Sequence, residues 1–164
     1  MEEKSCGRSV RHDPEPRTAP LIYPGHFDGG EVSWPREGFK KHNAIADCPE
    51  TDSLMVPGCT YVLTKRFTAK EEKRRVVAAV YTGERAGFLN HINYFHVKGA
   101  GLPERLAVGL ARFLNSEAVE TYFRTFSGHT QVNATDLRNL HYPSRAQLEA
   151  LARADDVESA LAGF

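Results

Sequence analysis

The chain has 164 residues, 41% hydrophobic and 26% charged, a composition typical of one globular domain with a sizeable core. Because no apolar run approaches the roughly 18 residues of a membrane helix and no basic-then-apolar leader opens the sequence, neither a membrane protein nor a secreted protein is expected. Cys6, Cys48 and Cys59 are widely spaced and form no CxxC pair, which argues against a disulfide framework or a zinc site and favours a reducing cytoplasm.

The charge is balanced but unevenly distributed. Lys and Arg total 21, as do Asp and Glu, so the net charge is zero and lacks the positive excess typical of nucleic-acid binders. Residues 65–75, KRFTAKEEKRR, nevertheless carry six basic and two acidic groups, whereas 149–164 carry four acids and one Arg. This pattern is compatible with one basic face, although a solvated surface loop would have the same composition.

The first third of the chain predicts short strands. Residues 1–18 are polar and without periodicity, which indicates a flexible lead-in. The apolar run 19–24 predicts a strand, and the turn followed by alternation in 28–35 predicts a second one. Residues 36–58, interrupted by Gly and Pro, are expected to be irregular.

The middle of the chain also favours strands. Residues 60–67 are β-branched and aromatic, with Tyr61 and Leu63 on one face and Val62 on the other. A capping box at 68–71 predicts a helical turn. The run 74–81 is then interpreted as a buried strand, with a continuous helix over 69–80 as the alternative. A turn at 82–87 precedes an alternating strand at 92–98.

After Gly101 the apolar period changes to that of helices. Leu106, Leu110 and Phe113 form one helical stripe after Pro103. A second helix is capped by Ser116, a brief third by Thr135, and a fourth begins at the capping box 144–147. The residues expected on the buried stripes of the last three helices are Val119, Tyr122, Phe123, Phe126, Leu137, Leu140, Leu148 and Leu151. Trp34, Phe113, Tyr122 and Phe123 are assigned to the core rather than to base stacking.

Strands first and helices last predict an α+β fold, in which a mostly antiparallel N-terminal sheet is followed by a C-terminal group of helices. We expect residues 1–18 to form the lead-in, 19–153 the functional domain, and 154–164 an acidic C-terminal tail.

Signatures of catalysis are missing from the sequence. Nothing matches GxxxxGK[ST] or GxGxxG, and Ser127-Gly128-His129 lacks the glycine pattern of a nucleophile elbow. His91 and His96 are not expected to share a metal, and the acids are too scattered for a metal-dependent nuclease. No catalytic residue and no metal ligand is therefore predicted.

The basic run 65–75 and the polar residues at 90–93 and 129–133 instead suit recognition of DNA. Asn and Gln side chains pair with adenine edges, Arg and Lys pair with guanine edges, and hydroxyl groups and cations hold phosphates. The candidates for phosphate contacts are Lys65, Arg66, Lys70, Lys73, Arg74 and Arg75. The candidates for base-edge or positioning contacts are His91, Asn93, His129, Gln131 and Asn133. For Thr135 and Asp136 we favour a role in stitching a turn.

The stretch FLNSEAVETYFRTFSGHTQVNATDLRNLHYPSRAQLEAL (113–151) resembles the closing part of a target recognition domain. The resemblance is to Eco57I-like adenine-specific DNA methyltransferases of restriction-modification systems and, more loosely, to type I restriction specificity subunits. Further blocks fit the same methyltransferases: PLIYPGHF (20–27), WPREG (34–38), KKHNAI (40–45), YVLTKRFTAKEEKRRVVAAVY (61–81) and NHINYFH (90–96).

This resemblance implies a domain that docks on double-stranded DNA and reads a short sequence. A separate catalytic domain, in cis or in trans, would flip out an adenine and methylate it with S-adenosylmethionine. The Asn-Pro-Pro-Tyr/Phe motif and the glycine-containing cofactor loop of such domains do not occur in this sequence. We therefore expect no methylation by this chain alone, and we expect the cofactor to bind elsewhere.

Two other functions remain open at this point. The amphipathic helices over 103–126 would suit a protein-interaction module that docks on a methyltransferase or restriction subunit without touching DNA. A small metal-dependent nuclease is the third possibility.

Overall fold

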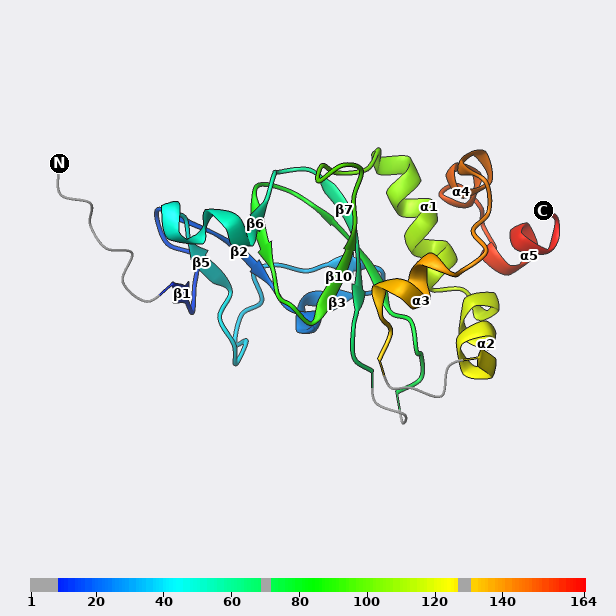
Figure 1. Cartoon of the computed structure of the whole chain (residues 1–164), viewed down its shortest axis with the longest axis horizontal. Coiled ribbons are helices and arrows are strands. Elements are labelled where there is room, and N and C mark those ends of the chain that lie inside the picture. The colour runs from blue at the N-terminus through cyan, green and yellow to red at the C-terminus, as the bar shows by residue number, and fades with distance from the viewer. Residues whose placement is uncertain (1–8, 69–71, 127–130) are drawn as a thin grey trace.

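The computed structural model describes residues 9–68, 72–126 and 131–164. Its architecture is α+β, as predicted, with two five-stranded sheets followed by helices. Figure 1 shows the two sheets side by side in the N-terminal and central part of the molecule, and the helices gathered beyond the second sheet. The predicted helical turn at 68–71 lies mostly outside the described residues, as do Cys6, Lys70 and His129.

The first sheet has the order β1-β5-β2-β9-β6. Its strands are β1 (Val10–Arg11), β2 (Thr18–Ile22), β5 (Ala44–Ala46), β6 (Met55–Val56) and β9 (Ala86–Phe88). All neighbours are antiparallel except β2 and β9. Short 3-10 helices, η1 (Pro24–His26) and η2 (Pro49–Leu54), follow β2 and precede β6.

The second sheet has the order β10-β7-β8-β4-β3. Its strands are β3 (Phe27–Asp28), β4 (Glu31–Val32), β7 (Thr60–Lys65), β8 (Ala78–Thr82) and β10 (Ile92–Phe95). Only β4 and β8 are parallel. Tyr61 and Leu63 pack in one apolar cluster and Val62 in another, so the predicted alternation of β7 separates two cores.

The described residues that follow form helices α1 (Glu104–Leu114), α2 (Glu117–Phe126), α3 (Ala134–Arg138), α4 (Arg145–Leu151) and α5 (Val157–Ala162). They form the larger cluster together with Val62, Val76 and Ala78. The predicted caps at Ser116 and Ser144 are confirmed, because their hydroxyl oxygens accept the N–H groups of Val119 and Gln147. Phe113 and Phe123 are buried as predicted, while Trp34 and Tyr122 are partly buried.

Several local predictions were wrong. Residues 36–58 contain β5, η2 and β6, because a three-residue buried strand is too short to display a period. The strand predicted at 74–81 begins only at Ala78, and the alternative helix is not formed over the described residues 72–80. Asn133 rather than Thr135 precedes α3, and Phe126 is 74% exposed rather than buried.

The two ends of the chain also contain regular structure. Within the predicted lead-in, Val10–Arg11 pairs with β5, and beyond residue 153 the carboxylate of Asp156 caps α5. Cys48 is disulfide-bonded, contrary to expectation, whereas Cys59 is free. Spacing in a sequence does not reveal which thiols meet in space, which is why this expectation failed.

Candidate nucleic-acid interface

The start of the basic run 65–75 and the polar segment before α3, which contains Gln131, lie next to each other at the end of β7. Phe67 forms an antiparallel bridge with Gln131. The backbone of Arg66 joins both neighbours, since its N–H donates to the His91 carbonyl at 2.9 Å and its carbonyl accepts the Val132 N–H at 2.8 Å. Figure 1 shows the segment that leads into α3 running beside the loop that follows β7.

Apolar residues fix the polar segment before α3. Val132 and Leu137 are 2% and 3% exposed and belong to the helical core, so the chain on either side of Asn133 is anchored. Asn93 strengthens this junction, because its Nδ2 donates to the Val132 carbonyl at 2.8 Å. Asn133 is exposed, and its N–H donates to the Asp136 carboxylate at 2.9 Å. Asn93 thus holds the segment before α3 in position. Asp136 stabilises the turn, as predicted.

An aromatic side chain that sequence reasoning assigned no role lies in the middle of this surface. Phe67 is 42% exposed, and its ring centroid lies 5.2 Å from that of His91 in an edge-on arrangement. The Arg66 guanidinium lies over the same ring, 5.6 Å from its centroid. An aromatic residue inside the basic run 65–75 was the signal available in the sequence.

The basic segment that follows β7 is anchored to α2. The Glu120 carboxylate accepts the Arg75 N–H at 3.1 and 2.8 Å, and Arg124 Nη2 donates to the Lys73 carbonyl at 2.9 Å. Arg74 donates to the Asn115 carbonyl and lies 3.3 Å from a Glu117 carboxylate oxygen. The position of this segment is therefore set by side chains of the first helices.

The predicted phosphate-contacting cations differ in their surroundings. Lys65 Nζ lies 3.8 Å from Glu72, and Arg74 is paired with Glu117. In the described part of the chain, the Arg66 and Lys73 side chains make no ion pair, and the Lys73 side chain is exposed. These two cations are the best placed to meet an external phosphate.

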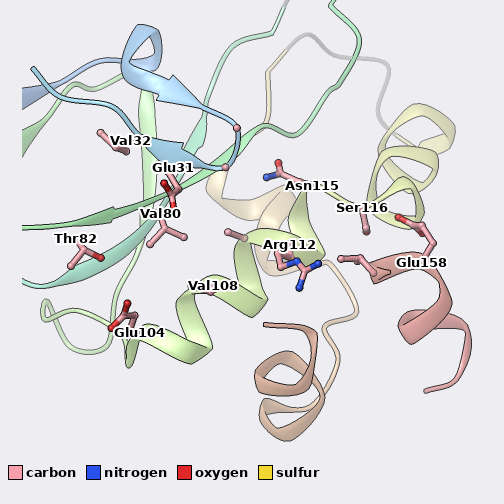
Figure 2. Close-up of a pocket in the computed structure, with 14 residues that line it drawn as sticks. Glu31, Val32, Val80, Thr82, Glu104, Val108, Arg112, Asn115, Ser116 and Glu158 are labelled. Atoms are coloured by element: carbon pink, nitrogen blue, oxygen red, sulfur yellow. The ribbon is translucent and has the colours of Figure 1, made fainter. Parts of the chain in front are cut away.

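A hollow of about 660 Å³ lies between β4, β8, helix α1, the link 115–116 between α1 and α2, and the start of α5 (Figure 2). Two of its polar side chains, Asn115 and Arg112, are engaged within the protein. Asn115 bonds both backbone groups of Ala78 at 2.8 and 2.9 Å, and Arg112 Nη1 donates to the Leu151 carbonyl at 2.5 Å. None of the residues predicted to contact DNA is among its lining residues, so we assign it no ligand.

The described residues contain no group of three or more His, Cys, Asp or Glu side chains arranged to hold a metal ion. Nor is any helix among them long and apolar enough to span a membrane.

Comparison with known proteins relates the chain to part of larger enzymes. It is 51% identical over 144 residues to the type II methyltransferase M.PstI of Providencia stuartii, covering 85% of this chain and 28% of that protein. It is 44% identical over 150 residues to the type II methyltransferase M.BsuBI of Bacillus subtilis, covering 88% of this chain and 30% of that protein. No family model and no solved structure matches. The chain is therefore a homologue of one part, less than a third of the length, of type II methyltransferases.

Proposed function

We propose that this chain is the DNA target recognition part of an adenine-specific methyltransferase of a restriction-modification system. The observation that carries the proposal is the bridge between Phe67 and Gln131, which brings a basic segment and a polar turn together on one surface. The similarity to type II methyltransferases supplies the enzymatic context. In this proposal the methyl transfer and its donor, S-adenosylmethionine, belong to the rest of the enzyme, in cis or in trans.

The contacts divide by chemistry. Arg66 and Lys73 hold phosphates, because their cationic groups are not paired with a carboxylate in the described structure. Lys65, Lys70, Arg74 and Arg75 extend the same positive segment. Gln131, Asn133, His91 and His129 read base edges, since amide and imidazole groups offer donors and acceptors together. Asn93 orients the turn through its bond to Val132.

The two classes of contact are separable by salt dependence. Lys73→Ala should weaken binding to every sequence and lower the slope of log K against log salt by about one, the contribution of one phosphate contact. Gln131→Ala should cost about 1–3 kcal/mol on the preferred site and little on other duplexes. Fluorescence anisotropy with duplexes selected from a random pool measures both.

Arg153 offers a matched control. It is an exposed cation between α4 and α5, two helices that lie apart from β7 in Figure 1, so Arg153→Ala should leave the salt slope unchanged. Binding of the Lys73 and Gln131 variants that equals the parent would contradict the assignment of the surface. If the parent chain binds no duplex at low salt, where a domain with few phosphate contacts is most easily detected, the proposed function is wrong.

A further inference from the structure

A second hollow adjoins the surface proposed to bind DNA. It has a volume of about 460 Å³, within the range typical of small-ligand sites. Its walls are residues 23–25 at the start of η1, the loop 36–41, and Leu89 and His91. Because the His91 ring also packs edge-on against Phe67, the hollow and the proposed interface share this residue.

The loop that forms one wall is strongly basic. Arg36, Lys40 and Lys41 are exposed and face only one acid of the lining, Glu37. Arg36 Nη1 donates to the Gly25 carbonyl, which ties that cation to the opposite wall. Lys41 Nζ lies over the Tyr23 ring, 5.4 Å from its centroid. The two lysines are therefore available to an anion that enters beside the ring.

Aromatic rings form the remainder of the hollow. Phe39 lies edge-on to Tyr23, with centroids 5.8 Å apart, and 4.3 Å from the buried ring of His26. A Cβ on Gly25 would approach Phe39 Cε2 to 2.7 Å, so glycine permits this close approach of chain and ring. The rings are thus packed in place before any ligand arrives.

Buried Asn43 holds the loop in this position. Its Oδ1 lies 2.8 Å from His26 Nε2 and accepts the Arg36 N–H at 3.3 Å, while its Nδ2 donates to the Arg36 carbonyl at 3.2 Å. Its own carbonyl accepts Trp34 Nε1–H at 2.6 Å. A fixed aromatic surface bordered by exposed lysine side chains is suited to a flat ring that carries a phosphate.

We propose that this hollow binds one nucleotide of the bound DNA that has left the base stack. The base lies against Phe39 and Tyr23, and the phosphate is neutralised by Lys40 and Lys41. The proposal rests on the proposed function, because the DNA must be held at Phe67 and Gln131 for the nucleotide to reach the adjoining hollow. Stacking on an aromatic ring tolerates any base, so the site adds affinity without sequence preference.

The test compares three fluorescein-labelled duplexes of the same sequence: one fully paired, one with a single unpaired adenosine, and one in which that unpaired position is abasic. The full chain should bind the unpaired adenosine about tenfold more tightly than the other two, as expected for one base stacked on an aromatic ring. Trp34, the single tryptophan of the chain, is joined to the loop through Asn43, and its emission should change only with the unpaired base.

Two variants assign the effect to the hollow. Phe39→Leu keeps an apolar side chain beside Gly25 and should abolish the preference for the unpaired base while leaving binding of the paired duplex unchanged. The double variant Lys40→Gln, Lys41→Gln should weaken binding of the unpaired duplex about tenfold or more, and Arg153→Gln should not. Circular dichroism verifies that each variant is folded.

The outcomes separate the two proposals. Equal affinity for the adenosine and abasic duplexes, or a preference that survives in Phe39→Leu, would overturn the nucleotide site while leaving the proposed function intact. Binding of the unpaired base without binding of the paired duplex would refute duplex recognition and, with it, the nucleotide site in the form proposed here. Absence of binding to all three duplexes would refute both.

Discussion

Glu120 is the residue whose loss should most directly loosen the proposed DNA-binding surface. Its side chain is 7% exposed, and its two oxygens accept the Arg75 N–H at 3.1 and 2.8 Å. Oε1 also accepts Arg124 Nε–H at 2.7 Å. The carboxylate thereby fixes the basic segment after β7 on helix α2.

The expected cost of Glu120→Ala follows from these contacts. Loss of a charged acceptor from the Arg75 N–H costs about 1.5–3 kcal/mol. The pair with Arg124, whose side chain is half exposed, contributes only about 0.3–0.5 kcal/mol. The free energy of unfolding should therefore fall by about 2–3.5 kcal/mol. Glu120→Gln retains one acceptor oxygen for the Arg75 N–H and should lose less.

Urea denaturation followed by far-UV circular dichroism measures the change, provided that the m-value stays constant. Glu117→Ala is the matched control, because Glu117 lies on the same helix but is 67% exposed and, among the described residues, its side chain pairs with Arg74 alone. It should cost under about 1 kcal/mol. Equal losses in the two alanine variants would refute the conclusion that Glu120 anchors the segment. DNA binding by Glu120→Ala should weaken with all sequences, as the segment that carries Lys73 loosens.

Three other residues yield predictions on stability. Gly109→Ala places a Cβ 1.7 Å from the Leu148 carbonyl oxygen, so α1 and α4 must separate. The free energy of unfolding should fall by more than about 2 kcal/mol although alanine has the better helix propensity, and a loss below about 1 kcal/mol in urea denaturation would contradict this. Asn115→Ala leaves both backbone groups of Ala78 without their partner and should cost about 2–3 kcal/mol, with faster amide exchange at Ala78 as the second measurement. Burial lowers the pKa of His26 below its ordinary value of 6.5, so the unfolded chain binds more protons and the free energy of unfolding should fall as the pH drops below about 6.5. His26→Gln should flatten this pH dependence, and an unchanged slope would exclude His26 as its source.

The longer elements were predictable because their signals are local. The stripe of Leu106, Leu110 and Phe113 predicts α1, and the alternation of Tyr61, Val62 and Leu63 assigns the two faces of β7 correctly. Capping chemistry located the starts of α2 and α4 for the same reason, since a cap and its helix are neighbours in the chain. The order of strands and helices, and hence the α+β class, followed from these patterns.

The strands of two or three residues gave no such signal. β5 is formed by three apolar residues, Ala44–Ala46, and exists because β1 and β2 flank it. Such a segment has too few residues to display a period, so only its partners identify it as a strand. The same holds for β1, where two residues of a polar lead-in pair with an edge formed more than thirty positions later.

The sequence by itself determined the fold class, the main helices, the two faces of β7, and the residue types available for recognition of DNA. The tertiary structure alone decided that Phe67 meets Gln131, that Glu120 holds the basic segment, and that residues 23–25 and 36–41 enclose one hollow together with Leu89 and His91. The physical reason is that periodicity records which side of an element is buried but not against what. The element against which that side packs is determined by contacts between segments distant in the chain, so no single stretch of residues identifies it.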